Sequence, residues 1–441
     1  MKIVILGAGE SGVGTAWLAQ KQGYDVFVSD MGTVTERYAK MLDERNIEWE
    51  QGSHTEAKIL DADVVVKSPG IPDTAPMIQK LIAKGMPIKS ELEFARPFSK
   101  GRTICITGSN GKTTTTSLIY YIMKESGVDV GLAGNIGRSY AMQVSEDDHD
   151  WYVLEISSFQ LDNMFDFRAD ISVLMNITPD HLDRYAFEMQ NYTDSKMRII
   201  QNQTPDDTFV YWKQDEHIEE ELHKRAEGYA PSPTPSSRPV HKGEPALLGF
   251  VDSDFERLSL AFSQMGQHNK RNALAAYFAT RTAGADEQLI RRCLIDFPGV
   301  EHRLERVAEK GGVLYINDSK ATNVDACNVA LQAMERPTIL IVGGKDKGND
   351  YSTIHQLVAD KCCGIVYLGA DNTKLHNAFD DLQYDGISIA DTHSMKDCVH
   401  ECVRMAKPGD TVLLSPCCAS FDLFRNMEDR GEQFKTLVRE L

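Results

Sequence analysis

The fold of the chain is decided by one stretch, Ile104–Thr114, which runs ICITGSNGKTT. Its apolar first half predicts a buried strand, and Gly108 and Gly111 break that strand into a loop before Lys112 and a helix. Such glycines let backbone N–H groups face an anion, a lysine reaches the outer phosphates, and the hydroxyl of Thr113 suits Mg²⁺. The full Walker pattern needs a further glycine where this chain has isoleucine. An ordinary strand-to-helix turn therefore remains an open alternative on these residues alone.

Length and charge limit the classes of protein that the chain can belong to. Its 441 residues suggest about three domains. The formal net charge of -18 excludes a general nucleic-acid binder, which needs a basic face to displace counterions. No apolar run is long enough for a signal peptide or a membrane span, so a cytoplasmic protein without membrane contact is expected. Nine cysteines without paired metal-ligand spacing predict buried thiols rather than disulfides or zinc.

Residues 1–98 alternate short apolar strands with helical stretches, which predicts a small doubly wound unit. The run from Gly7 to Gly12, GAGESG, matches the dinucleotide fingerprint, and Asp30 ends the second strand where a ribose-binding acid lies. NAD is the first interpretation, but the unit is about half the size of a dinucleotide domain. A mononucleotide or diphosphate site fits better, and a glycine turn without ligand stays possible. The run SPG at 68–70 would line the same crevice or form a plain turn.

In residues 99–298 further strands end in polar side chains, which predicts one functional sheet edge. Glu155 ends an apolar strand and suits a metal ligand, although a helix-capping acid is the alternative. His181 in a DHLD turn is a metal ligand or a capped surface residue, and Lys196 by itself is typical of a solvated helix face. Asn269 and Asn272 lie one turn apart on a helix and either cap it or face a base.

The remaining segments are a proline-rich run and a second alternating unit. The run at 229–245, YAPSPTPSSRPVHKGEP, predicts an irregular surface excursion. Residues 299–441 again alternate strands with helices, which predicts a second doubly wound sheet. Polar groups follow three of its strands, at 318–323, 343–348 and 415–422. Three polar strand ends on one sheet predict a binding edge, although each loop singly has an ordinary explanation.

Together these motifs resemble the Mur ligase family, ATP-dependent enzymes that add amino acids to the peptidoglycan precursor. The resemblance covers the whole chain and is carried, in order, by GAGESG, GSNGKTT, LEISSFQL, NITPDHLDRY, YTDSKMRI, GQHNKRNALAA, PGVEHRLE, INDSKATNVDA, GGKDKGNDY and SPCCASFDLFRNMEDRGEQFK. It implies an α/β fold of three domains. These are an N-terminal Rossmann-like UDP-binding domain at 1–98, a central P-loop ATPase domain with a mostly parallel sheet at 99–298, and a C-terminal Rossmann-like amino-acid-binding domain at 299–441.

The first and last motifs are similar to those of the D-glutamate-adding branch of the family. This implies that D-glutamate is ligated to UDP-N-acetylmuramoyl-L-alanine through an acyl phosphate and a tetrahedral intermediate, giving ADP and phosphate in cytoplasmic peptidoglycan synthesis. The implied cofactors are ATP and two Mg²⁺ ions. A monomer is expected, with no nucleic-acid or membrane partner.

The resemblance also implies roles for individual residues. The catalytic residues would be Lys112, Glu155, His181, Lys196 and Arg303. Thr113 and Glu155 would hold one metal, and His181 the second, with the help of Lys196 carbamylated by CO₂. ATP would be held by Gly108, Ser109, Asn110, Gly111, Lys112, Thr113, Thr114, Asn269, Asn272, Arg303 and Asp318. The UDP substrate would be held by Gly9, Glu10, Ser11, Gly12, Asp30, Ser68, Gly70 and Asn135. D-glutamate would be received by Lys320, Thr322, Lys347, Ser420 and Phe421.

One position departs from the family pattern. After Asp30 the chain has Met31-Gly32, where a Thr-Arg pair can contact uracil and phosphate in family members. The resemblance therefore does not identify the uracil contacts of this chain.

Overall fold

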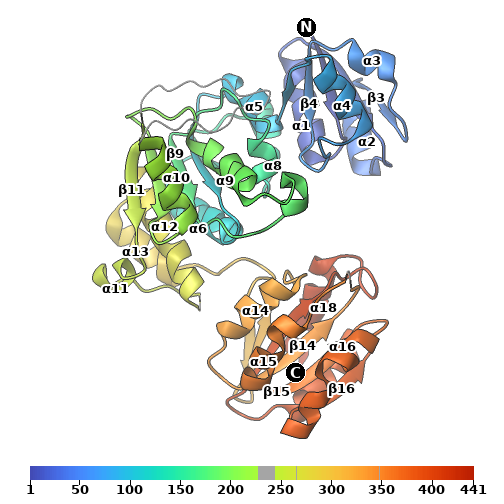
Figure 1. Ribbon diagram of the computed structural model, residues 1–441, viewed down its shortest axis with the longest axis vertical. Helices are drawn as coiled ribbons and strands as arrows, with labels where there is room; N and C mark the ends of the chain where they lie inside the picture. Colours follow the sequence, from blue (N-terminus) through green and yellow to red (C-terminus); the bar gives the residue numbers. More distant parts are fainter. Residues whose placement is uncertain (227–243, 265, 347) are drawn as a thin grey trace. The chain divides into compact units, whose positions relative to one another are not determined.

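The computed structural model describes residues 1–226, 244–264, 266–346 and 348–441. It divides into two compact units, the first formed by Met1–Phe262 with His268–Phe297 and the second by Ser263–Gln267 with Pro298–Leu441. The expected irregular run at 229–245 lies outside the described residues except for its last two positions, and Lys347 also lies outside them. The three expected α/β sheets are present, two of them in the first unit (Figure 1).

The first sheet is fully parallel, with strand order β3-β2-β1-β4-β5. Its chain order turns back between β1 and β4, and this reversal is where open α/β sheets bind ligands. The unexpected strand is β3, whose sequence EWEQ is too polar to be recognised as a strand. Its elements are β1 (Lys2–Leu6), α1 (Glu10–Lys21), β2 (Asp25–Asp30), α2 (Glu36–Asp43), β3 (Glu48–Gln51), α3 (Glu56–Leu60), β4 (Val64–Lys67), α4 (Pro76–Ala83), β5 (Ile88–Lys89), α5 (Glu91–Ala95) and η1 (Arg96–Phe98).

The second sheet is also fully parallel, in the order β11-β10-β9-β6-β8-β7. The decisive stretch Ile104–Thr114 supplies the central strand β6 and the start of α6. The elements are β6 (Arg102–Thr107), α6 (Lys112–Glu125), β7 (Val130–Gly134), α7 (Tyr140–Glu146), β8 (Trp151–Glu155), α8 (Ser158–Leu161), β9 (Ile171–Leu174), η2 (Leu182–Tyr185), α9 (Met189–Met197), η3 (Arg198–Ile200), β10 (Thr208–Trp212), α10 (Glu216–Ala226), β11 (Ala246–Phe250), α11 (Asp254–Arg257), α12 (Gln267–Thr282) and α13 (Glu287–Asp296).

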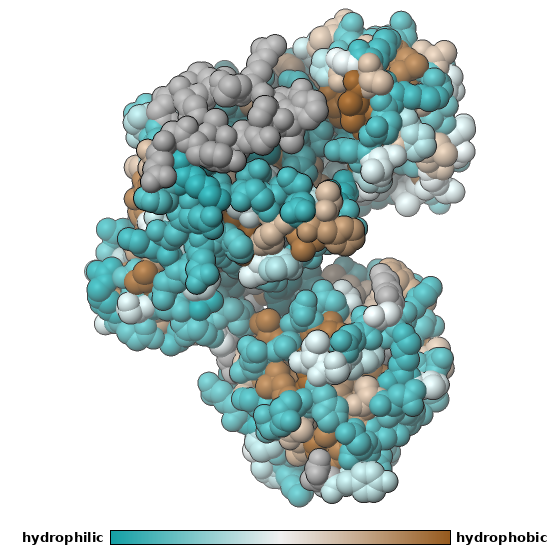
Figure 2. All heavy atoms as spheres, viewed as in Figure 1, coloured by the Kyte–Doolittle hydropathy of each residue, from teal (hydrophilic) through white to brown (hydrophobic). Residues whose placement is uncertain are grey.

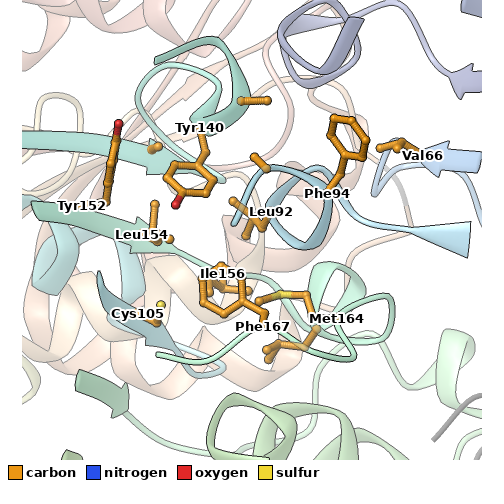
Figure 3. Close-up of a cluster of buried hydrophobic side chains, with 14 of the residues drawn as sticks. Val66, Leu92, Phe94, Cys105, Tyr140, Tyr152, Leu154, Ile156, Met164 and Phe167 are labelled. Atoms are coloured by element: carbon orange, nitrogen blue, oxygen red, sulfur yellow. The ribbon is translucent and has the colours of Figure 1, made fainter. Parts of the chain in front are cut away.

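One hydrophobic core runs through both sheets of the first unit, and the short helix α5 lies inside it. Figure 3 shows Leu92 and Phe94 of α5 between Val66 of the first sheet on one side and Tyr140 of α7 and Leu154 of β8 on the other. Each of these side chains is less than a tenth exposed, so the burial of their apolar area stabilises the two sheets as one body.

The third sheet has the order β12-β13-β17-β14-β15-β16 and makes up the second unit. It is parallel except for β12, which pairs antiparallel with β13 at one edge. The elements are β12 (Glu305–Lys310), β13 (Val313–Asn317), α14 (Val324–Gln332), β14 (Thr338–Gly343), α15 (Ser352–Lys361), β15 (Cys362–Leu368), α16 (Thr373–Phe379), η4 (Asp380–Asp385), β16 (Ser388–Thr392), α17 (Met395–Met405), β17 (Thr411–Cys417) and α18 (Met427–Glu440).

The state of the cysteines is the one expected from the sequence, which predicted buried thiols rather than disulfides. All nine cysteines are free thiols, and eight of them are buried, with Cys363 the exposed one. The face in Figure 2 is mostly hydrophilic, with hydrophobic residues scattered over it. Within the described residues, no helix combines the length and the apolar character that crossing a membrane requires.

Candidate functional site

In the loop between β6 and α6, the side chain of Lys112 turns back and hydrogen-bonds to the backbone of the loop itself. Gly108 has a φ of 146° and Gly111 a φ of 83°, which glycine adopts without strain. The Lys112 ammonium donates to the carbonyl oxygens of Gly108 at 2.7 Å and Ser109 at 2.9 Å. It thus lies over the N-terminus of α6, where the helix dipole also favours an anion. Thr113, half-buried, and Thr114, buried, form the first turn of that helix.

A second loop, which follows β9, holds the first one in place. Asn176 accepts from the backbone N–H of Asn110 at 2.8 Å and donates to its carbonyl oxygen at 3.1 Å. The hydroxyl of Ser109 donates to the carbonyl oxygen of Thr178 at 2.8 Å and lies 3.1 Å from the hydroxyl of Tyr192. These contacts hold the loop against the segment that follows β9. Sequence reasoning assigned no role to the bracing residues, because each is an ordinary polar loop or helix residue.

Glu155 ends β8 directly beside the loop, because it pairs in register with Ile106 of β6. Its side chain is 1% exposed. One carboxylate oxygen, Oε1, accepts from Asn135 Nδ2 at 2.8 Å, whereas Oε2 is buried and has no hydrogen-bond partner among the described residues. Buried carboxylate oxygens are normally paired, so this oxygen is available as a ligand for a cation. The helix-capping alternative is not realised, since Ser157 caps α8.

Lys196 on α9 is buried, with 1% of its surface exposed. Its ammonium lies 4.5 Å from the centre of the Tyr192 ring, and within the described ranges no ion pair joins it to a carboxylate. Burial lowers the pKa of Lys196 well below its usual value, and the nearby charge of Lys112 lowers this pKa further. The expectation of a solvated helix face is therefore wrong for this residue. A buried amine of low pKa is a nucleophile at neutral pH.

His181 lies on the exposed turn between β9 and η2. Its backbone has a φ of 52°, its ring centre lies 5.2 Å from that of Phe159, and its Nε2 lies 3.6 Å from a carboxylate oxygen of Asp180. Phe159 follows Glu155 by four residues, so His181 faces the segment that leaves β8. No hydrogen bond or ion pair between described residues joins His181 to Glu155 or Lys196.

Asn269 and Asn272 form a buried pair on α12 next to the loop. Asn272 Nδ2 donates to Asn269 Oδ1 at 2.9 Å. A Cβ atom at Gly111 would lie 2.5 Å from Asn272 Oδ1, which shows how closely the pair approaches the loop. The structure therefore groups Lys112, Glu155, Lys196 and this pair in the first unit.

In the first sheet, the loops after β1 and β4 meet at the point where the strand order reverses. A Cβ atom at Gly7 would lie 2.3 Å from Ser68 Oγ, so only glycine permits this approach. Gly9 caps α1, and Gly12 packs on the carbonyl oxygen of Gly7. The carboxylate of Asp30 accepts from the backbone N–H groups of Ala8 and Gly32, both at 2.7 Å.

The other UDP-site residues named from sequence lie in different surroundings. Glu10 accepts from the Tyr38 hydroxyl at 3.1 Å and from the backbone N–H of Ser139 at 3.3 Å, so it faces the second sheet. Ser11 lies in the first turn of α1, and Gly70 follows β4 with open space around it. Asn135 is exposed and contacts Glu155, which associates it with the second sheet.

In the second unit, Asp318 connects the ends of two strands with the turn that carries Arg303. Its carboxylate accepts from Ser415 Oγ at 2.9 Å and from the backbone N–H of Leu304 at 3.1 Å. Burial raises the pKa of Asp318 to about 7, although the charge of Arg303 opposes this shift. The Nε of Arg303 is buried and has no hydrogen-bond partner among the described residues.

The three polar loops of the third sheet contact one another, as their positions at strand ends predicted. The backbone N–H of Lys345 donates to the carbonyl oxygen of Ala419 at 2.8 Å. Arg430 on α18, 1% exposed, donates to the carbonyl oxygens of Cys418 at 3.1 Å and Ser319 at 2.8 Å. Burial lowers the pKa of Arg430 to about 10. Sequence reasoning gave Arg430 no role because an arginine within a polar helix looks solvent-exposed.

The residues predicted to receive D-glutamate belong to these loops. Lys320 is half-buried and Thr322 exposed in the loop after β13. After β17, Ser420 is 1% exposed, whereas the side chain of Phe421 is 64% exposed. Lys347 lies outside the described residues.

Three family models match the chain. They are the MurD N-terminal domain at residues 2–77, the Mur ligase middle domain at 106–280, and the glutamate ligase domain of Mur ligases at 302–418. The order of these matches agrees with the three sheets of the structure.

Full-length relatives and solved structures agree with these matches. The chain is 56% identical to UDP-N-acetylmuramoylalanine--D-glutamate ligase of Bacteroides fragilis, with 100% of each chain covered. It is 48% identical to the protein of that name from Porphyromonas gingivalis, over 100% of this chain and 98% of the relative. The fold is similar to that of UDP-N-acetylmuramate-alanine ligase MurC from Thermotoga maritima, with a TM-score of 0.59, 20% identity, and coverage of 100% and 99%. With its three matching domains, its loop at 108–114 and its full-length relatives, the chain belongs to the Mur ligase family.

Proposed function

We propose that this chain ligates D-glutamate to UDP-N-acetylmuramoyl-L-alanine and converts ATP to ADP and phosphate. Relatives with 56% and 55% identity over the full chain carry the name of that ligase, which supports the proposal. The structural observation that carries it is the combination, in one unit, of the Lys112 loop with the unpaired oxygen of Glu155 and the buried Lys196. A protein that only binds nucleotides has no need of the last two groups.

The reaction has two steps, and the loop serves the first. The terminal carboxylate of the UDP substrate attacks the γ-phosphorus of ATP, the bond to the ADP oxygen breaks, and an acyl phosphate forms. Lys112 would stabilise the negative charge on the β- and γ-oxygens, and residues 108–114 would hold the phosphates through backbone N–H groups at the start of α6. Positioning and charge stabilisation therefore supply most of the catalysis.

In the second step the neutral amine of D-glutamate attacks the acyl carbon. The tetrahedral intermediate loses phosphate, the amide forms, and the amine gives up a proton. We assign D-glutamate to Lys320, Thr322, Lys347, Ser420 and Phe421. Cations and hydroxyls at this edge suit its two carboxylates. Asn269, Asn272, Arg303 and Asp318 are assigned to the nucleotide, with Arg303 the group suited to a phosphate.

The site also fits the divalent cation that the family implies. Thr113 and Glu155 would hold one Mg²⁺, and the buried unpaired Oε2 of Glu155 is the ligand that this structure provides. His181 would hold a second ion. Mg²⁺ would neutralise charge on the phosphate oxygens during transfer. Lys196 would form a carbamate when its neutral amine attacks CO₂ and releases a proton, and the new carboxylate would help to hold the second ion.

The UDP part of the substrate would lie where the first sheet reverses its strand order. We assign it to Gly9, Glu10, Ser11, Gly12, Asp30, Ser68 and Gly70, with Asn135 nearer the sugar and alanine. Asp30 already accepts two backbone N–H groups, so its first effect would be to shape the loop. We further propose a cytoplasmic monomer with the domain boundaries 1–98, 99–298 and 299–441.

The test is phosphate release by the purified full-length chain with ATP and Mg²⁺. We expect release only when both UDP-N-acetylmuramoyl-L-alanine and D-glutamate are present. Release with L-lysine or diaminopimelate in place of D-glutamate would assign the chain to another Mur ligase activity. The variant Lys112→Ala should lose at least about a hundredfold in rate, because it removes the cation of the loop. An unchanged rate would remove Lys112 from the mechanism.

A further inference from the structure

The turn that carries Arg303 has a backbone that needs external support. His302 has a φ of 62° and Leu304 a φ of 45°, which L residues rarely adopt. Such conformations persist only when the surrounding structure holds them. The side chain between them, Arg303, keeps its buried Nε without a hydrogen-bond partner among the described residues. The position of Arg303 therefore depends on what holds the two residues beside it.

Side chains of two strands, Glu305 of β12 and Asn317 of β13, hold this turn, and a glycine of α18 leaves room for it. Glu305 Oε2 accepts from the backbone N–H of His302 at 2.9 Å and from Asn317 Nδ2 at 3.0 Å. Asn317 Nδ2 also lies 2.8 Å from His302 Nδ1. A Cβ atom at Gly431 would lie 2.2 Å from His302 Nδ1, so this glycine of α18 leaves room for the histidine ring. The carboxylate of Glu305 is thus the acceptor for the backbone N–H of His302, on one side of Arg303, whereas Asp318 accepts from that of Leu304 on the other side.

Lys435 of α18 supplies the charge that holds Glu305. Its side chain is 4% exposed, and its ammonium lies 3.1 Å from Glu305 Oε1 and 2.7 Å from Glu432 Oε1, with a third pair to Glu301. Three carboxylates that approach this closely repel one another unless a cation lies between them. Glu301, His302 and Glu432 have the spacing of a metal site, but the protein's own ammonium already pairs with both glutamates.

We propose that Lys435 is a positioning residue for Arg303, because it fixes the turn 301–304 in the conformation that presents the guanidinium to the nucleotide. The inference rests on the proposed function, in which Arg303 contacts ATP. It goes beyond that function because Lys435 itself touches no substrate in it.

A purely structural role is the competing explanation. In that case Lys435 only attaches α18 to the second unit, and its loss lowers stability without changing the affinity for nucleotide. Lys310 of β12 is a matched control, because its ammonium also contacts α18, through the carbonyl oxygen of Arg439, but lies outside the turn. The two lysines therefore separate attachment of the helix from support of the turn.

The experiment measures ADP binding by calorimetry, together with KM for ATP and for the UDP substrate, in the full-length protein. For Lys435→Met we expect about tenfold weaker ADP binding and a similar rise in KM for ATP, with KM for the UDP substrate unchanged. Lys435→Arg should restore most of the affinity, because it keeps the charge. Lys310→Met should bind ADP like the wild type.

Two results would overturn the inference: folded Lys435→Met that binds ADP like the wild type, or an equal loss in Lys310→Met. If circular dichroism shows that Lys435→Met does not fold, Glu301→Gln takes its place. This variant removes only the charge of the most exposed of the three partners of Lys435, and about threefold weaker ADP binding is expected. Unchanged binding by Glu301→Gln would then reject the role. Wild-type protein that binds ADP but does not join the two substrates would reject the proposed function and leave this test intact.

Discussion

At the scale of single residues, burial of the Lys196 ammonium costs folding free energy, and the same lysine is proposed to act in the reaction as a carbamate. We expect Lys196→Met to abolish ligase activity yet to unfold at a higher urea concentration than the wild type near pH 7. A buried ammonium without a carboxylate partner is costly, whereas methionine of similar length packs without charge. Equilibrium unfolding of both proteins in CO₂-free buffer provides the measurement. A less stable, fully active variant would contradict both parts.

The same lysine predicts a dependence of stability on pH. Its pKa is lowered in the folded state, so between that value and the unfolded value of 10.5 the unfolded chain binds more protons. Stability therefore rises with pH across this window, by up to about 1.4 kcal/mol for each unit of pKa shift. Comparing wild type with Lys196→Met at several pH values isolates the contribution, and equal slopes would exclude it.

The titration of Asp318 should change stability in the opposite direction, so that stability falls as pH rises. Burial raises its pKa from 3.8 to about 7 in the folded state, so the stability it contributes is complete below 3.8 and is lost as pH rises through about 7. Asp318→Asn keeps an acceptor for the N–H of Leu304 and removes the titration. We expect the variant to lose less stability than the wild type between about pH 5 and pH 8. Thermal melts across that range measure this, and parallel curves would contradict it.

At the scale of elements, the contact between α1 and α7 joins the first two sheets. A Cβ atom at Gly14 of α1 would lie 1.9 Å from Ser139 Oγ and 2.7 Å from Ser139 Cβ. Gly14→Ala should therefore lower the free energy of unfolding by about 1–3 kcal/mol. Gly9→Ala is the control, because nothing lies within 4 Å of its Cβ position. Equal urea midpoints for the two variants would show that the contact between α1 and α7 accommodates the added methyl group without loss of stability.

Elements with apolar runs were predictable from the sequence, and polar edge strands were not. The apolar runs VVVK, TILIVG and WYVLE are strands, in agreement with the apolar strands expected in 1–98, 299–441 and 99–298, because both faces of a parallel strand are buried. Two polar segments, EWEQ in β3 and ERVAEK in β12, are strands at sheet edges. Their strand conformation comes from pairing with a neighbouring strand and not from the propensity of their own side chains. The antiparallel direction of β12 likewise had no local signal.

The site was predictable where a residue type itself implies chemistry. The loop at 108–114 is visible as a pattern because anion binding needs glycines at fixed spacing. Glu155 is visible because the end of an apolar strand has no structural need for a carboxylate, so the residue suggests a functional role. The burial of Lys196, Arg430 and Lys435 was not visible, since it depends on segments far away in the chain. Lys196 was singled out by family resemblance alone.

At the scale of the whole molecule, the proposed nucleotide contacts are divided between the two compact units. Lys112 and Asn272 belong to the first unit, and Arg303 and Asp318 to the second. If one ATP contacts all four residues, as proposed, its binding should restrain the two units relative to each other. We expect the radius of gyration from small-angle scattering to fall when ADP and the UDP substrate are added together. Identical curves with and without the ligands would show that the units keep one arrangement.

The distribution of the thiols makes this motion measurable in the natural protein. Eight of the nine cysteines are buried, and Cys363, at the start of β15 in the second unit, is exposed. A maleimide dye should therefore attach to one position without any cysteine having to be introduced or removed. Because that position belongs to the unit assigned to D-glutamate, its fluorescence anisotropy would follow the tumbling of this unit during turnover, so the chain carries its own labelling site for spectroscopy.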